Sequence, residues 1–189
     1  WTGEAVYNPF DVLLLFQERQ FRPWWFETAT PTFLIDLLLE RGVFIPRLGR
    51  LLASEALLSA FDVDHIATEA LLFQTGYLTI DEVRQRGALI EYRLRWPNLE
   101  VQASLTGALL ESLAPVPQDP ALRPSGLYDL LLANDFEGMR VLFTAFFQSI
   151  PGEWYTKNDI ARYEGFYASV FYSHFAALGL DLTPEDSSN

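Results

Sequence analysis

The 189-residue sequence has no cysteine, a single lysine and only two histidines. Without cysteine the chain cannot form a disulfide, a thiol nucleophile or a cysteine-ligated zinc or iron–sulfur site. With His65 and His174 alone, one chain cannot build a three-histidine metal site. No apolar run approaches the ~18 residues that a membrane span needs. We therefore expect a cytoplasmic protein without a membrane partner.

The single lysine, Lys157, excludes two further classes of site. A Walker A loop needs a Gly-Lys-Ser/Thr step, and Lys157 instead follows Thr156. Nucleases of the PD-(D/E)XK type need an acidic residue two positions before their lysine, where this chain has Tyr155. The chain therefore lacks both a Walker ATPase site and a complete standard nuclease site.

Acidic residues outnumber basic ones by 25 to 13, which gives a net charge of −12. This balance argues against a protein whose whole surface binds nucleic acid. A local basic cluster lies in residues 77–97, where four arginines stand against three acids. The members of this cluster are Arg84, Arg86, Arg93 and Arg95, with Asp81, Glu82 and Glu91.

The first 76 residues predict helices and short elements. Asn8-Pro9 is typical of a helix start, and this helix should end near Phe21. Thr30-Pro31 predicts a second start, with Gly42 as its stop. Pro46 and Gly49 predict short elements over residues 43–61. Asp64 is expected to cap a helix that Gly76 ends. The apolar stripe predicted for the second helix is Phe33, Leu34, Leu37 and Leu38.

After Gly76 the period of the apolar residues changes. Residues 77–80 predict a short strand, and Asp81 to Gly87 is polar enough for a hairpin tip. Residues 90–96 alternate between apolar and charged, which is typical of a strand with one buried face. Pro97-Asn98 predicts the start of another helix. This layout is that of a winged-helix module. The apolar stripe predicted for the helix after Pro97-Asn98 is Val101, Leu105, Leu109 and Leu113.

The rest of the sequence predicts a helical bundle. Four prolines make residues 115–124 the expected linker. Residues 127–133 and 136–150 predict a helical hairpin, in which Asp135 caps the second helix. Asp159 is expected to open a last helix that ends at Gly179. The predicted fold class is mainly α with a small β-hairpin. The stripe predicted for the helix after Asp135 is Phe136, Met139, Phe143, Phe146 and Ile150.

Several strings resemble one family of bacterial and archaeal proteins, in which a predicted AAA-ATPase-like domain precedes a C-terminal PD-(D/E)XK nuclease-like domain. The resemblance covers essentially the whole chain, and the ten-residue string around Gly76 is its most specific part. The strings are Val6-Tyr7-Asn8-Pro9-Phe10, Trp25-Phe26-Glu27-Thr28, Thr30-Pro31-Thr32-Phe33-Leu34, Leu71-Leu72-Phe73-Gln74-Thr75-Gly76-Tyr77-Leu78-Thr79-Ile80, Pro97-Asn98-Leu99-Glu100-Val101 and Tyr163-Glu164-Gly165-Phe166-Tyr167.

The resemblance implies that this chain is a middle piece of such a protein. Residues 1–114 would be the helical lid and winged-helix-like module of the ATPase-like half, residues 115–124 the linker, and residues 125–189 the opening helices of the nuclease-like half. The nucleotide-binding core and the Glu-X-Lys motif lie outside this stretch in the family. ATP and a divalent metal are therefore implied for the parent protein only, and no cofactor is expected in this chain. The expected partners are the rest of the parent protein, further copies of the chain, or DNA through the wing.

Glu164 is the carboxylate of most interest, although no catalytic residue is assigned. Helical spacing places it on one face with Tyr167 and Phe171, which should raise its pKa unless it is paired. The resemblance implies a nuclease-like helix carboxylate beside a metal site. The alternative, which we favour, is a rim glutamate paired with Arg162 or Lys157. Glu164 is expected to share its face also with Ile160 and Phe175.

Two histidines lie near residues that invite a site. Asp62, Asp64 and His65 are close in sequence, but the capping role of Asp64 is the simpler explanation, so no metal site is predicted. His174 lies among aromatic residues and is expected at the edge of the core. No triad spacing surrounds it.

The arginines of residues 77–97 have two interpretations. They could contact phosphates, or they could form a solvated strand face balanced by Glu82 and Glu91. The charge of the rest of the chain favours the balanced face. Similarly, Trp24, Trp25 and Phe26 could form an exposed docking patch or belong to the core.

Three functional hypotheses follow. The first is a non-catalytic fragment of an AAA-ATPase-like, nuclease-like protein with a structural, regulatory or DNA-associated role. The second is a protein-interaction or oligomerisation module without a nucleic-acid role. The third, an enzyme working through Glu164, is the weakest because no second catalytic group can be named.

Overall fold

The computed structural model describes residues 7–20, 24, 32–59, 66–114, 123–151 and 164–184. This part of the chain is mainly helical and contains one small antiparallel sheet, so the predicted fold class is confirmed. No helix in the described ranges is long and apolar enough to cross a membrane. The elements are α1 (Pro9–Glu18), α2 (Thr32–Glu40), the 3-10 helix η2 (Ile45–Arg50), β1 (Leu52–Ser54), α3 (Glu55–Ser59), α4 (Thr68–Gln74), β2 (Thr79–Arg86), β3 (Leu89–Arg95), α5 (Leu99–Leu113), α6 (Pro124–Ala133), α7 (Phe136–Ser149) and α9 (Glu164–Ala176).

Contacts within the chain define two compact units. The sheet unit comprises Trp1–Pro31 and Arg47–Ser104, and the helical unit comprises Thr32–Pro46 and Leu105–Asn189. One boundary between them falls inside α5. The contacts thus group the residues differently from the predicted division at 115–124, of which residues 115–122 lie outside the described part. That division stays a prediction.

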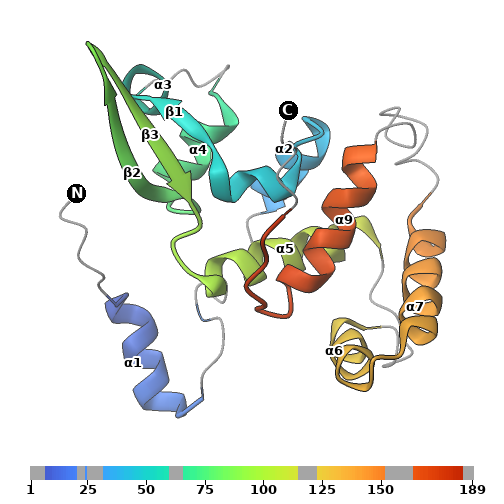
Figure 1. Cartoon of the computed structure of the whole chain (residues 1–189). Helices are drawn as coiled ribbons and strands as arrows, with labels where there is room; N and C mark the ends of the chain where they lie inside the picture. Colours follow the sequence, from blue (N-terminus) through green and yellow to red (C-terminus); the bar gives the residue numbers. More distant parts are fainter. Residues whose placement is uncertain are drawn as a thin grey trace. The chain divides into compact units, whose positions relative to one another are not determined.

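The sheet unit has the connectivity of the winged-helix-like layout. Its three strands are ordered β1-β3-β2, so the short first strand pairs with the last and the long hairpin extends from them (Figure 1). Helices α3 and α4 lie between β1 and β2 in the chain and pack against each other, and α3 also contacts β1 and β3. Ala53 and Leu94 are buried in this sheet. The short elements predicted over residues 43–61 are confirmed by η2, β1 and α3.

The hairpin differs from its prediction in where it turns. Asp81 to Gly87 is not a tip: residues through Arg86 belong to β2, and the turn is the two residues Gly87 and Ala88. Gly87 has φ +65°, whereas Ala88 is not among the residues with positive φ. This is the pattern of a type II′ turn, which suits the twist of a two-residue hairpin. The sequence from Asp81 to Gly87 is as polar as a loop because one face of β2 is charged.

The N-terminus of α4 also differs from its prediction. The helix begins at Thr68 after Ala67, whose side chain makes no capping bond. The prediction that Asp64 caps this helix is therefore wrong, and Asp64 itself lies outside the described residues. The predicted stop is confirmed, because Gly76 follows the helix with φ +84°.

The first two helices confirm the predicted elements but not all of their details. Asn8 caps α1 by accepting a hydrogen bond from Phe10 N at 3.0 Å, yet the helix ends at Glu18, before the predicted Phe21. Arg19 ends it in the left-handed conformation, with φ +54°. In α2 the buried stripe is rotated from the predicted one: Phe33 is 71% exposed. The residues buried instead are Leu34, Ile35, Leu38 and Leu39. Thr30 and Pro31 lie outside the described part.

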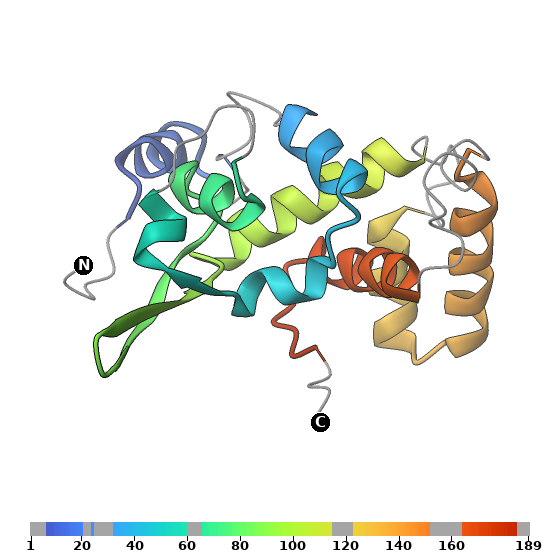
Figure 2. The same ribbon diagram turned by 90° about the horizontal axis from the view of Figure 1, so that it is seen from above.

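The helical unit contains the predicted hairpin of α6 and α7, which lie side by side (Figure 2). Asp135 caps α7 as predicted, because its Oδ1 accepts a hydrogen bond from Gly138 N at 2.9 Å. Phe136, expected in the apolar stripe of α7, is instead 74% exposed, and Leu142 is buried. The core cluster consists of Leu127, Leu142 and Phe143, with Leu130, Leu131, Met139, Phe147, Phe175 and Leu178 packed around it.

Helices α5 and α9 complete the predicted pattern. All four residues of the stripe predicted for α5 are buried. The last helix is described from Glu164 and ends at Ala176, and Gly179 follows with φ +74°. Asp159, its predicted first residue, lies outside the described part. Ser169 of α9 ties the helix to the segment after α2, because its Oγ accepts a hydrogen bond from Ile45 N at 3.1 Å.

Gly49 leaves space for the Trp96 indole, which is 9% exposed. A Cβ on Gly49 would lie 2.8 Å from Trp96 Cδ1. We predict that Gly49→Ala lowers the free energy of unfolding by about 1–3 kcal/mol, because the indole must move in a packed core. Urea unfolding measures this change.

Gly107→Ala is the matched control. This glycine lies inside α5, and the nearest atom to its new Cβ would be Ala177 Cβ at 4.0 Å, an ordinary contact. Alanine favours helix over glycine by up to about 1 kcal/mol, so the control should be neutral or stabilising. Equal stability of Gly49→Ala and the wild type would contradict the prediction.

Candidate functional site

The candidate site is the charged face of the β2–β3 hairpin. Side chains of a strand alternate between two faces. The register pairs Glu82 with Arg93 and Arg84 with Glu91, so these side chains share one face. We call this set the charged face: Asp81, Glu82, Arg84, Arg86, Glu91, Arg93 and Arg95.

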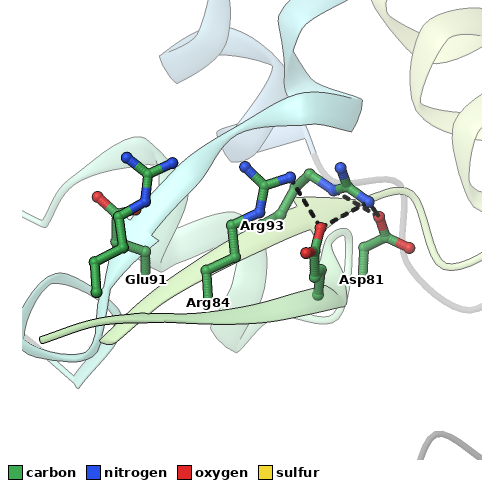
Figure 3. A network of polar contacts seen from close by, with 6 residues as sticks. Asp81, Arg84, Glu91 and Arg93 are labelled. Atoms are coloured by element: carbon green, nitrogen blue, oxygen red, sulfur yellow. Dashed lines mark hydrogen bonds and ion pairs between the residues drawn. The ribbon is translucent and has the colours of Figure 1, made fainter. Parts of the chain in front are cut away.

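A β-bulge in β2 gives Arg93 a second carboxylate partner on this face. The register shifts between Ile80 and Glu82, so Asp81 is an extra residue on β2. In a bulge two residues oppose one on the neighbouring strand. Asp81 and Glu82 therefore both reach Arg93, at 2.7 Å and 3.1 Å from its Nη2. Figure 3 shows Asp81, Arg84 and Arg93 on the same side of the hairpin.

Every arginine of the charged face has a carboxylate partner. Arg84 Nη2 lies 3.0 Å from Glu82 Oε2, and Arg95 Nε lies 3.2 Å from Asp81 Oδ1. Arg86 holds the loosest pair, with its Nε 3.7 Å from Glu91 Oε2. The hydrogen bond from Arg84 lowers the pKa of Glu82 and raises the pKa of Arg84. The structure thus places all four predicted arginines on one face, each beside an acid.

Helices α3 and α4 add no positive charge to this face. In helix-turn-helix proteins the second helix enters the major groove of DNA. The corresponding helix here, α4, has the sequence TEALLFQ, whose only charged residue is Glu69. Helix α3 carries Glu55 and no basic residue. Neither helix has an arginine or lysine with which to contact phosphates or guanine edges.

Sequence reasoning missed the apolar side chains near the hairpin tip. Val83 is 56% exposed, Leu89 69% and Ile90 39%. The predicted polar tip includes Val83, and the predicted buried strand face includes Ile90. The signal was present in the sequence, because a two-residue Gly-containing turn can be read from Arg86-Gly87-Ala88-Leu89.

Glu164, the predicted nuclease-like carboxylate, is the first residue of α9, and its side chain lies outside what the structure describes. Its predicted neighbours Tyr167 and Phe171 are 37% and 47% exposed. These two rings contact α7, where Phe147 lies 5.4 Å from Tyr167 and Phe143 lies 4.6 Å from Phe171, between ring centroids. The aromatic face of α9 is therefore only partly buried.

The structure describes only some of the residues in the metal-site and docking-patch hypotheses. Asp62, Asp64 and His65 lie outside the described part, as do Trp25 and Phe26. Among the described side chains, no group of three or more His, Asp or Glu residues is placed to hold a metal ion. Trp24 is 3% exposed and its Nε1 donates to Gln20 O at 3.3 Å. Trp24 therefore belongs to the core and to no exposed patch.

His174 lies in the last turn of α9 and is 1% exposed. Its ring meets two phenylalanine rings edge-on: the centroid distances are 4.4 Å to Phe146 and 5.1 Å to Phe143. Among the described residues, neither ring nitrogen has a hydrogen-bond partner. Burial lowers the pKa of His174 to about 4. The imidazole is neutral and buried at neutral pH, so it is a core residue without the access that a catalytic base needs.

No family model matches this chain. No solved structure matches it either. The chain is 65% identical over 189 residues to a protein of Azotobacter chroococcum mcd 1 that is named an uncharacterized protein in the vnfD 5′ region. The match covers 100% of this chain and 37% of that relative, so the chain spans little more than a third of the relative's length.

The burial of His174 predicts a pH-dependent stability. The unfolded chain takes up a proton near the ordinary pKa of 6.5, whereas the folded chain takes it up only near 4. The stabilising contribution of the neutral imidazole is therefore complete above pH 6.5 and is lost as the pH falls toward 4. Between pH 7.5 and pH 5.0 we expect the free energy of unfolding to fall by about 2 kcal/mol.

Urea unfolding at the two pH values tests this prediction. His174→Phe and His174→Met keep an apolar side chain in the pocket and remove the titrating group. Most of the pH dependence between 7.5 and 5.0 should disappear in both variants. An unchanged slope in both would show that other groups cause it.

Proposed function

We propose that this chain is a non-catalytic protein-interaction or oligomerisation module of a longer protein. The observation that carries the proposal is the ion pairing on the charged face, where each of the four arginines lies beside a carboxylate. The carboxylates of the hairpin therefore neutralise most of the positive charge of these arginines.

Phosphate binding would have to compete with these internal carboxylates. Proteins gain affinity for DNA by replacing the counterions of phosphates with their own cations. Here Arg93 already lies beside both Asp81 and Glu82, and the charge of these carboxylates would repel an approaching phosphate. The net charge of −12 adds long-range repulsion, and α4 offers no basic residue. Protein partners face no comparable penalty.

The longer protein belongs to the proposal as well. The chain covers only 37% of its relative, which supports the proposal that it is a segment of a larger polypeptide. The strings around Asn8, Gly76 and Glu164 support a parent that resembles AAA-ATPase-like proteins with a nuclease-like C-terminus. The missing Walker lysine and Glu-X-Lys motif support a non-catalytic role for this segment.

DNA association through the wing is the second candidate. It is favoured by one observation: four arginines share one face of an extended hairpin. Arg86 is the most accessible of them, because its side chain is 70% exposed and its pair with Glu91 is the longest. If DNA binds, this arginine near the tip should make the first contact.

Fluorescence anisotropy with labelled duplex and single-stranded DNA separates the two candidates. We predict that the wild type shows no salt-sensitive binding, because the arginines are compensated. The matched variant Asp81→Asn/Glu82→Gln/Glu91→Gln keeps side chains of similar size and frees the arginines. This variant should gain binding that weakens as salt is raised.

The variant Arg84→Ala/Arg86→Ala/Arg93→Ala/Arg95→Ala completes the comparison. If the wild type binds DNA at low salt and this variant does not, the wing is a nucleic-acid contact and the proposed function is wrong. Circular dichroism spectra of all variants show whether the fold is kept.

A further inference from the structure

Strand β2 has one side that no described strand covers. In the order β1-β3-β2 it lies at the edge and, among the described strands, pairs only with β3. An edge strand presents unpaired N–H and C=O groups that can pair with another chain. The residues of β2 after its bulge, Glu82 to Arg86, keep a regular register with β3. This regular stretch is the part of β2 that can accept a new strand.

The turn determines which backbone groups of β2 point outward. In a two-residue turn the flanking residues, here Arg86 and Leu89, form a hydrogen-bonded pair. Such pairs alternate along an antiparallel ladder, so Arg84 and Glu82 also direct their backbone groups toward β3. Val83 and Gln85 therefore direct theirs away from β3, toward the open edge.

The outward groups fit a second copy of the same strand that is paired about Val83. When two copies of β2 pair antiparallel about a two-fold axis at Val83, the two Val83 residues form a hydrogen-bonded pair. That pair uses the N–H and C=O groups that face the open edge. A two-fold arrangement places the same surface on both copies, as homodimers commonly do.

The same register is complementary in charge. It places Glu82 opposite Arg84 of the second copy and, by symmetry, Arg84 opposite Glu82 of the second copy. Opposite charges directly across a strand pair are stabilising, and like charges are destabilising. Arg84 already contacts Glu82 of its own chain at 3.0 Å. A guanidinium has five N–H donors, so it can bind the second carboxylate as well.

The same register also brings apolar side chains of the two copies together on the other face of the hairpin. Val83 is 56% exposed and pairs with Tyr92, and Ile90 is 39% exposed and pairs with Gln85. All four side chains lie on the face opposite the charged one. Pairing about Val83 brings the two Val83 side chains together and covers apolar surface that the single chain leaves in water.

We infer that a second copy of this chain is the partner, bound antiparallel along β2 with Val83 at the two-fold axis. The two three-stranded sheets then form one continuous sheet. This inference rests on the proposed function, because it names the partner of the interaction module. It predicts two groups that the association needs: the charge pair Glu82–Arg84 and the outward N–H of Val83.

Sedimentation velocity of two charge variants tests the charge pair. Glu82→Arg places arginine opposite arginine, and Arg84→Glu places glutamate opposite glutamate. Each variant alone should raise the dissociation constant of the dimer about tenfold or more. Mixed together, the two variants restore opposite charges at both positions, so the mixture should form a heterodimer with an affinity close to that of the wild type.

A backbone variant tests the strand pairing independently of charge. Val83→Pro removes only an N–H that points away from β3, and proline is tolerated at such edge positions. It should abolish the dimer, whereas the matched control Val83→Thr keeps the N–H and should keep the dimer. Circular dichroism melting curves confirm that each variant folds.

Three outcomes would overturn the inference: a wild-type chain that is monomeric at the highest concentration reached, a dimer that Val83→Pro leaves intact, or a mixture of the charge variants that stays monomeric. The DNA experiment separates this failure from that of the proposed function. A monomer that does not bind DNA contradicts only the dimer, whereas salt-sensitive DNA binding contradicts the proposed function.

Discussion

The β-bulge at Asp81 determines the chemistry of the hairpin. If the register of Glu82 opposite Arg93 continued without interruption, Asp81 would lie opposite Leu94, whose side chain is 0% exposed. Burying an unpaired carboxylate against that leucine would be costly. The shift places Ile80 opposite Leu94 instead and turns Asp81 to the charged face. One extra residue thus keeps the apolar face apolar and supplies a carboxylate to two arginines.

That second carboxylate changes what the arginines can do. With Glu82 and Glu91 alone, four arginines would leave a clearly positive strip. Asp81 contacts both Arg93 and Arg95 and brings the face close to balance. The individual exposed pairs are weak and are screened by salt. Their combined effect is on specificity: they lower the attraction for phosphate and leave the change of charge along β2, from acidic to basic, as the distinguishing feature of the surface.

The features that could be predicted from the sequence are those set by local chemistry. The Asn8 and Asp135 caps, the buried stripe of α5 and the alternation of β3 depend on residues within one element. The bulge depends on the partner strand, because only pairing with β3 shows that Ile80 and Val83 must share a face across an odd spacing. Which side of α2 is buried similarly depends on what the helix packs against, since Phe33 and Ile35 are both apolar.

The candidate site was predicted by composition but not by geometry. The four arginines and three acids of residues 77–97 are visible in the sequence, and so is their near balance. Their common face is not, because Asp81 to Gly87 resembles a polar loop until Arg86 and Leu89 are known to flank the turn. Ala67 illustrates the same limit: a helix start without a side-chain cap has no local signal.

The edge of β2 combines features that elsewhere oppose pairing. Bulges and charged side chains are common ways to prevent sheets from joining at their edges. Here the bulge lies at one end of β2 and leaves Glu82 to Arg86 regular. The charges change sign once along the strand, from Asp81 and Glu82 to Arg84 and Arg86, whereas a strand protected by lysines would repel every copy of itself. Glu82 and Arg84, on either side of an outward Val83, repel a parallel copy in the same register and attract an antiparallel copy centred on Val83. Charge therefore selects the partner of this edge as much as it protects it.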